Sequence, residues 1–210
     1  MTGAVSTGSA DPGGHLASAR VPALSAWWLL IGGVIGLVSS MTLTVEKIDI
    51  LLDPSYVPSC NINPILSCGS VMVTPQASLL GFPNPLLGLM AFTVVIVTGL
   101  LALTKVDLPQ WYWLGLTAGV LAGVVFVHWL IFESLYRIGA LCPYCMVVWA
   151  VTMSLLVVVA SIASRPALQA RQSGPAWLVY QWRWSLAALW FTAVFLLCMV
   201  RFWDYWSTLL

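Results

Sequence analysis

The sequence predicts an all-α integral membrane protein, a bundle of four transmembrane helices to which a fifth is added. Of the 210 residues, 60% are hydrophobic and only 7% are charged, and the mean hydropathy is +0.96. Because a soluble domain carries roughly 25% charged residues, this chain cannot cover its own surface in water. Twelve tryptophans, many of them beside the apolar runs, are typical of an interfacial aromatic belt. The net charge of +1 leaves no basic surface for nucleic acid.

The N-terminal half carries two apolar runs long enough to cross a bilayer, which takes about 20 helical residues. Residues 1–20 precede them and are rich in Gly, Ser and Ala without periodicity, so we expect a disordered tail. The first span is expected over residues 24–45, since charged residues follow from Glu46 onward. The second is expected over residues 85–104, where Lys105 ends the run.

Three more apolar runs follow in the C-terminal half. The third span is expected over residues 111–132, anchored by aromatic residues at its start, and a tight turn at 133–137 leads to a fourth span at 141–163. A polar linker separates these from a fifth span at 184–202. The predicted units are therefore a tail (1–20), a four-helix core (21–163), a cytoplasmic linker (164–183), and a fifth transmembrane helix with the C-terminus (184–210).

The distribution of basic residues predicts which side each loop faces, because cytoplasmic segments carry an excess of Lys and Arg. With the N-terminus in the cytoplasm, the inner segments hold five of the eight basic residues. The loop at 46–84, the start of the fourth span and the C-terminus then face outward, into an oxidising compartment where disulfides persist. The five inner basic residues are Arg20, Lys105, Arg165, Arg171 and Arg183.

The motif Cys142-Pro143-Tyr144-Cys145 opens the fourth span, and two thiols at this spacing are typical of a redox switch. Pro143 favours the first helical position, which makes Cys142 the predicted N-cap. The helix N-terminus there stabilises a thiolate and lowers its pKa. Cys145 lies one helical turn deeper in the membrane, so it is the better candidate to react with an electron acceptor dissolved in the lipid. A structural disulfide, or half of a metal site, is the alternative interpretation.

The outward loop carries a second cysteine pair, Cys60 and Cys68, and the break at Asn63-Pro64 between them allows a bridge. The pair either passes electrons to Cys142 or staples the loop, and four cysteines allow three pairings. No charged residue follows Asp53 in this loop, so it is not expected to stand free in water. We expect a short helix over residues 65–73 to lie on the membrane surface as a lid.

These features together resemble the vitamin K epoxide reductase (VKOR) family: an outer-loop cysteine pair, Asn84-Pro85-Leu86-Leu87-Gly88 at the second span, and CxxC at a later span. The resemblance covers residues 24–163. The fifth span, and the absence of a lysine-rich tail, are similar to the bacterial branch. DsbB-like members there reoxidise a periplasmic DsbA-like thioredoxin-fold protein and reduce a membrane quinone of the menaquinone, vitamin K or ubiquinone type. The resemblance implies a bacterial inner-membrane location and a separate thioredoxin-fold partner.

The resemblance also implies roles for single residues. Cys60 would take electrons from the partner, Cys68 would exchange with Cys142, and Cys145 would stand beside the quinone ring. Asn84 matches an asparagine whose side chain hydrogen-bonds a quinone oxygen, although Asn before Pro is also an ordinary N-cap. No metal site is implied.

Other candidate residues are less specific. Thr74 matches a position that holds the family's lid closed, and is otherwise a plain loop threonine. Trp149 stands where vertebrate members have a quinone-binding tyrosine, so its indole N–H is a candidate quinone donor and packing is the alternative. His128 and Glu133 are candidate proton relays, since ionisable groups within a span are functional suspects. Cys198 is expected to be a packing residue.

The leading functional hypothesis is a membrane thiol oxidase that supports disulfide bond formation by passing electrons through two cysteine pairs to a quinone. One alternative is a quinone or vitamin K epoxide reductase that uses thiols only as its reductant. Another is a non-catalytic membrane scaffold with structural disulfides.

Overall fold

The computed structural model describes residues 21–170 and 174–208, so the tail predicted at 1–20 lies outside the described residues. The described chain is almost entirely helical, and five of its helices are long and apolar enough to cross a membrane. This confirms the predicted all-α membrane fold. The five helices are α1 (Ala23–Leu52), α3 (Pro85–Leu103), α4 (Gln110–Phe132), α5 (Pro143–Ala170) and α7 (Arg183–Arg201).

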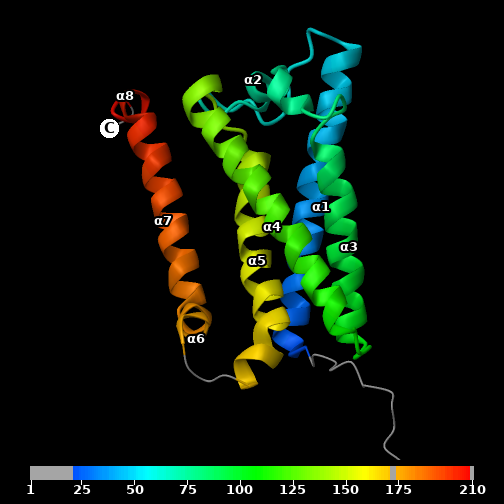
Figure 1. Ribbon diagram of the computed structural model, residues 1–210. Coiled ribbons are helices and arrows are strands. Elements are labelled where there is room, and N and C mark those ends of the chain that lie inside the picture. The colour runs from blue at the N-terminus through cyan, green and yellow to red at the C-terminus, as the bar shows by residue number, and fades with distance from the viewer. Residues whose placement is uncertain (1–20, 171–173, 209–210) are drawn as a thin grey trace, which may run out of the picture.

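The first four long helices form a bundle in which α1 packs on α3 and α5, and α4 packs on α5 (Figure 1). Glycines allow the close approach of α1 and α3. A Cβ added to Gly33 or Gly99 would lie 2.7 or 2.8 Å from an atom of the facing helix, and one added to Gly36 would overlap the Phe92 ring. Small residues at such positions are typical of helix interfaces in membranes.

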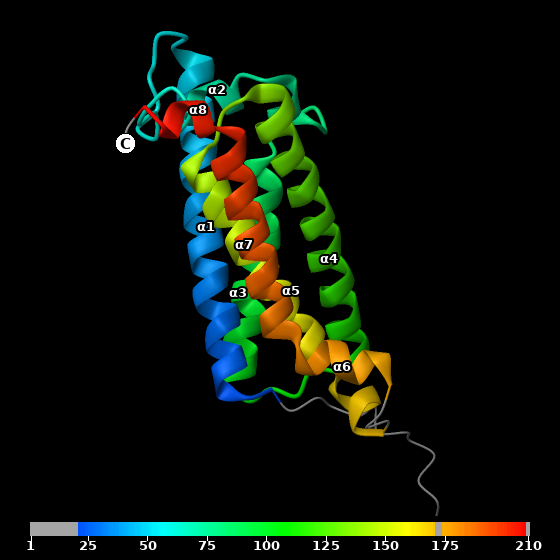
Figure 2. The same cartoon turned by 90° about the vertical axis from the view of Figure 1, so that its left-hand side faces the viewer.

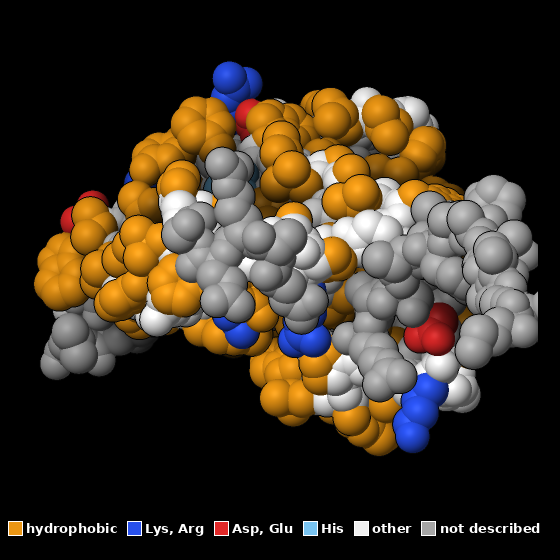
Figure 3. Space-filling view, turned by 60° about the horizontal axis from the view of Figure 1, so that its bottom comes forward, with side chains coloured by type: hydrophobic (Ala, Val, Ile, Leu, Met, Phe, Trp, Pro, Cys, Tyr) orange, Lys and Arg blue, Asp and Glu red, His pale blue; other side chains and the backbone are white. Residues whose placement is uncertain are grey.

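Helix α7 stands beside this bundle rather than within it, and its main neighbour is α5 (Figures 1 and 2). Two short helices flank it, α6 (Pro175–Gln181) and α8 (Trp203–Trp206). At the end where α4 begins, hydrophobic side chains cover most of the visible described surface, with separate Lys and Arg side chains among them (Figure 3). Large apolar side chains are also exposed along the long helices, including Val38, Val97 and Val125, which suits contact with lipid.

Three boundaries differ from those expected. Helix α1 continues to Leu52 instead of ending at residue 45, because Glu46 is buried and hydrogen-bonded and does not mark an exit into water. Much of 164–183 is helical, since α5 runs to Ala170 and α6 follows. The turn expected at 133–137 is a π-helical segment, η2 (Glu133–Ile138), and Gly139 ends it with a φ of 72°.

Residues 53–84 form a cap over one end of the bundle, called the lid here. It contains α2 (Cys68–Met72) and the 3-10 helix η1 (Pro75–Ser78). The helix expected over residues 65–73 is therefore shorter than predicted. Ile65 and Leu66 are extended instead, because their backbone pairs with the residue that precedes the CxxC motif.

Candidate active site

A short backbone pairing joins the lid to the start of α5. Leu66 and Leu141 form a parallel bridge, in which the Leu141 N–H donates to the carbonyl of Ile65 at 2.7 Å. The Ser67 N–H donates to the Leu141 carbonyl at 2.9 Å. Because a cysteine follows closely after each paired leucine, this register brings the two cysteine pairs of the sequence together.

Four cysteines meet at this junction. Cys60 and Cys68 form a disulfide, so the bridge that Asn63-Pro64 allows is made. Cys142 and Cys145 are free thiols. The Sγ of Cys142 lies 3.1 Å from the Sγ of Cys68, and Cys60, Cys68 and Cys142 are only 5%, 0% and 0% exposed. The geometry therefore presents one thiol to one sulfur of a buried disulfide.

Cys142 occupies the position just before α5, and the backbone N–H of Cys145 points at its Sγ at 3.4 Å. This is an N-cap arrangement, as Pro143 at the first helical position predicts. A hydrogen bond from the Cys145 side chain, helped by the backbone N–H groups of Cys145 and Tyr144, lowers the pKa of Cys142 below its ordinary value. Burial and the charge of Glu46 act in the opposite direction. In exchange with Cys68, the Cys142 thiolate is the attacking group in one direction and the leaving group in the other, and a lowered pKa favours that thiolate.

Asparagine side chains fold the loop between the lid cysteines. The Oδ1 of Asn63 accepts hydrogen bonds from the N–H groups of Ile65 and Leu66, at 3.0 and 2.7 Å. The Oδ1 of Asn61 accepts from the Gly69 N–H at 2.9 Å. These local turns, which Asn favours, return the chain so that residues 60 and 68 are close enough to bridge.

A buried carboxylate on α1 fixes the segment that carries Cys60. Glu46 is 5% exposed, and its oxygens accept hydrogen bonds from the hydroxyl of Ser59 at 2.5 Å and from the Ser59 N–H at 3.2 Å. The Tyr56 hydroxyl donates to the same carboxylate at 3.2 Å. Sequence reasoning missed this role, although an ionisable residue continuous with an apolar span is the signal for it.

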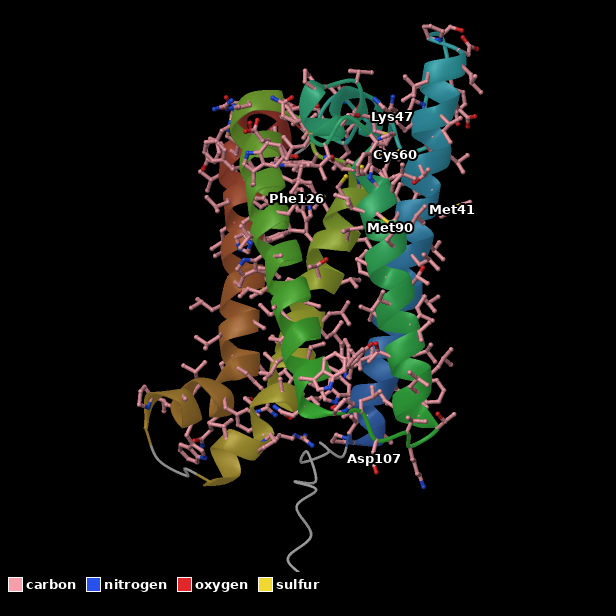
Figure 4. All side chains as sticks on the ribbon, turned by 45° about the vertical axis from the view of Figure 1, so that its right-hand side comes forward. Met41, Lys47, Cys60, Met90, Asp107 and Phe126 are labelled. Carbon is pink, nitrogen blue, oxygen red and sulfur yellow. A yellow bond between two sulfur atoms is a disulfide. The ribbon has the colours of Figure 1, made fainter. Side chains whose placement is uncertain are left out.

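A cavity of about 570 Å³ lies under the lid, within the range usual for small-molecule sites. Its lid end is lined by Thr74, Asn84, Cys145 and Trp149, so the structure brings these predicted residues together. Lys47 is the single charged residue among the described residues that line it. Figure 4 shows Lys47 and Cys60 at the lid end of the bundle, and Asp107 at the opposite end.

Asn84 ties the lid to the start of α3. Its Nδ2 donates to the Gln76 carbonyl at 2.7 Å, and its Oδ1 accepts from the Leu79 N–H at 3.1 Å. Asn84 holds the N-cap position of α3, as expected, but its side chain makes no capping bond there. The physical reason is that Asn84 already has helical backbone angles and its side chain bonds the lid instead. An amide nitrogen carries two hydrogens, so one donor remains.

Trp149 and Thr74 both line the cavity but differ in their bonding. Trp149 is 3% exposed, and its indole N–H finds no partner among the described residues. A buried indole N–H usually has a partner, so this donor is available to a ligand. The Thr74 hydroxyl donates to the Val71 carbonyl at 2.7 Å, which keeps it within the lid.

The two candidate proton relays lie outside the cavity lining. His128 is on the side of α4 that faces α7, where one ring nitrogen bonds the Val124 carbonyl at 2.8 Å and the other accepts from the Trp190 indole at 2.7 Å. Both ring nitrogens of His128 are therefore hydrogen-bonded, and the bond to Trp190 joins α7 to α4. Glu133 is buried and lies 3.6 Å from the Arg137 guanidinium. Neither side chain is hydrogen-bonded to a cysteine among the described residues, and their role as proton relays stays a prediction.

Two further residues complete the picture. Lys47, which sequence reasoning treated only as the end of a span, donates from its ammonium to the Met72 carbonyl at 2.6 Å. It thereby holds the end of α2 to α1, beside the cavity. Cys198 is buried on α7 in an apolar cluster with Phe202 and Leu135, as expected for a packing residue.

A family model described as "Vitamin K epoxide reductase family" matches residues 27–160 of the chain. The matched segment runs from α1 into α5, includes the four clustered cysteines, and ends before α7. A comparison with curated proteins gives no match.

Proposed function

Because the chain belongs to the vitamin K epoxide reductase (VKOR) family, whose members are membrane oxidoreductases that use quinones, we propose that it is a quinone-linked thiol oxidase. In this proposal it reoxidises a DsbA-like thioredoxin-fold protein outside the cytoplasm and passes the electrons to a membrane quinone. The observation that supports it best is the 3.1 Å contact between the Sγ atoms of Cys142 and Cys68. That contact links the disulfide of the lid to a thiol pair beside the cavity.

The proposed sequence of exchanges begins at the lid. The partner's dithiol attacks the Cys60–Cys68 disulfide, so the partner gains a disulfide and the lid pair is reduced. Cys68 then attacks Cys142 of a Cys142–Cys145 disulfide, which forms a Cys68–Cys142 bond and releases the Cys145 thiol. Cys60 attacks Cys68 in that bond, which restores the lid disulfide and releases the Cys142 thiol at the start of α5. These two thiols are what the structure contains, together with the restored Cys60–Cys68 bond.

The last step transfers two electrons and two protons from Cys142 and Cys145 to a quinone, which yields a quinol and a new disulfide. The cavity supports this step, because Cys145 lines it and its walls are largely apolar. The free N–H groups of Trp149 and Asn84 are suited to hydrogen-bond the quinone oxygens. A quinone dissolved in the lipid reoxidises Cys142 and Cys145 after each turnover, so the pair can accept electrons again.

The buried disulfide indicates that the lid must move before a partner can react with it. Cys60 is 5% exposed and Cys68 is fully buried, while the partner is a folded protein. The hydrogen bonds of Glu46, Asn84 and Lys47 to lid residues are the contacts that such a movement would break or bend. The proposed orientation places the lid outside the cytoplasm, in the compartment where the partner's disulfides persist.

The test is quinone-dependent oxidation by the purified full chain in lipid nanodiscs. A reduced DsbA-like protein serves as the electron donor, and both its thiols and the quinol formed are measured. We expect two thiols lost per quinol, and no turnover with Cys145→Ser. The matched control is Cys198→Ser, which removes a buried thiol on α7 and should retain turnover.

Two results would contradict the proposal. Unchanged quinol formation in Cys145→Ser would remove the thiol pair from the reaction. Turnover with a vitamin K epoxide, without oxidation of the thioredoxin-fold protein by quinone, would favour the epoxide reductase alternative instead.

A further inference from the structure

We propose that the C-terminal end of α7 positions the junction between the lid and α5, with Arg201 as the positioning residue. The junction is the parallel pairing of Leu66 with Leu141, next to which Cys68 lies beside Cys142. The inference rests on the proposed function, because the junction matters for turnover only if disulfide exchange crosses it. It gives the fifth helix, which lies outside the segment that the family model matches, a part in that exchange.

Helix α7 is attached to the bundle at few points along its length. Among the five long helices of the described chain it has the smallest buried share, 11% of its apolar stretch. Near its start, the centroid of the Trp184 ring lies 6.0 Å from that of the Trp28 ring of α1. Figures 1 and 2 show its C-terminal end, with α8, at the same end of the bundle as α2. The C-terminal contacts of α7 are therefore the ones that can reach the junction.

Arg201 makes the hydrogen bond that holds this end of α7. Its Nε donates to the Leu135 carbonyl at 2.9 Å. Carbonyls in the last turn of a helix lack a donor from a following turn, and Leu135 belongs to η2, where the Gly139 N–H donates to the Ser134 carbonyl instead. Arg201 therefore supplies a donor to a carbonyl at the end of η2, and it joins α7 to the segment that leads into the CxxC motif.

The residues after Arg201 pack in the same apolar cluster as both sides of the junction. Phe202 is 7% exposed and belongs to this cluster together with Ile65 of the lid and Leu141. Trp206 of α8 packs against the cluster as well. The Leu141 N–H donates to the Ile65 carbonyl, so the end of α7 contributes to the cluster that contains both residues of this bond. Loss of the Arg201 bond should therefore loosen the junction.

The two steps of the proposed electron transfer differ in their need for the junction. Exchange joins Cys68 to Cys142, whose Sγ atoms lie 3.1 Å apart on the two sides of the pairing. A misplacement of about 1 Å can lower the rate of a reaction about 100-fold. Reduction of quinone by Cys142 and Cys145 uses two thiols at the start of α5 and does not cross the junction. A loosened junction should therefore slow exchange and spare quinone reduction.

The test measures quinol formation by the fully reduced full chain in nanodiscs, without a thioredoxin-fold partner. The two cysteine pairs then hold four thiols, enough to reduce two quinones. The first quinol forms when Cys142 and Cys145 give two electrons and two protons to a quinone and become a disulfide. Cys60 and Cys68 must reduce that disulfide across the junction, and become a disulfide themselves, before the second quinol forms. Stopped-flow absorbance of the quinone separates the two phases.

Arg201→Met keeps the length of the side chain up to Nε but removes the donor. We expect it to slow the second phase about tenfold, equivalent to about 1.4 kcal/mol, and to leave the first phase unchanged. Arg201→Gln should restore the second phase, because the amide nitrogen of Gln lies at the same position along the side chain as Nε of Arg. The matched control is Arg183→Met at the start of α7, which removes a guanidinium bond to the Tyr180 carbonyl and should leave both phases unchanged.

A second readout is hydrogen exchange of the Leu141 and Ser67 amides, which donate the hydrogen bonds of the junction. Arg201→Met should speed their exchange about tenfold, whereas Arg201→Gln should not. Equal slowing of both phases would mean that Arg201 only stabilises the fold, and two unchanged phases would mean that α7 does not position the junction. Either result overturns the inference. Absence of any quinol from the unsubstituted chain would instead refute the proposed function on which the inference rests.

Discussion

Replacement of Glu46 by Gln tests whether the buried carboxylate positions the Cys60 segment. The two hydrogen bonds from Ser59 are charge-assisted in the native chain, and such bonds contribute about 1.5–3 kcal/mol against about 0.5–1.5 kcal/mol for neutral ones. The neutral amide keeps the shape but loses about 1 kcal/mol per bond, or about 2 kcal/mol in total. That is about a 30-fold shift toward an open lid segment.

The measurement is hydrogen exchange of the amides of residues 53–63 in the full chain. Glu46→Gln should speed exchange there by about 30-fold, while amides of α3 remain unchanged. The matched control is Asp49→Asn, which removes the same charge one turn along α1 from a side chain outside this hydrogen-bond set.

Glu46→Gln should also change the pKa of the Cys142 thiol. The charge of Glu46 raises the pKa of Cys142, so Glu46→Gln should lower that pKa further and increase the thiolate fraction. Alkylation of Cys142 at different pH values measures it. Native exchange rates in the lid of Glu46→Gln, together with an unshifted alkylation profile, would refute the role assigned to this carboxylate.

Three other outcomes follow from the geometry. In Cys145→Ser, attack of Cys142 on Cys68 should form a Cys68–Cys142 disulfide and release the Cys60 thiol, which alkylation then traps. Mass spectrometry detects this disulfide, and recovery of only the Cys60–Cys68 bond would contradict the exchange path. The rate at which Cys142 attacks the lid disulfide should fall as the pH falls through the lowered pKa of Cys142, because protonation removes the thiolate. Quenched-flow alkylation measures this rate, and a rate independent of pH would contradict the prediction. Gly99→Ala should destabilise the bundle by about 1–3 kcal/mol, because the added methyl meets the backbone of α1. Gly115→Ala should be neutral or stabilising by up to about 1 kcal/mol, because nothing lies near the added methyl. Thermal unfolding in detergent measures both variants, and equal effects would contradict the packing described.

Much of the fold follows from local sequence properties. Long uncharged runs must be helices within a membrane, since every backbone group there needs an internal hydrogen-bond partner. The N-cap role of Cys142 also follows locally, from the proline beside it. The lid helix was predicted too long, because the pairing of Leu66 with Leu141 joins residues 75 positions apart, and no local pattern reports that.

The candidate site was predictable in its residues but not in its arrangement. The four cysteines and Asn84 stand out by type and spacing. The bonds of Asn84 to the lid, and the position of His128 against α7, depend on which helix faces meet. Glu46 looked like a span boundary because a charged residue is expected to face water. The hydroxyls of Ser59 and Tyr56, which donate hydrogen bonds to its buried carboxylate, belong to the lid rather than to the span.

By itself, the sequence determined that this chain lies in a membrane as apolar helices and that its thiols are spaced for exchange, because composition and short-range spacing depend on nothing else. Only the tertiary structure decided that Gly99 lies in a helix contact while Gly119 lines the cavity, although both are glycines in apolar helices. The physical reason is that a glycine's role is set by the atoms that face it, and those atoms come from segments distant in the chain.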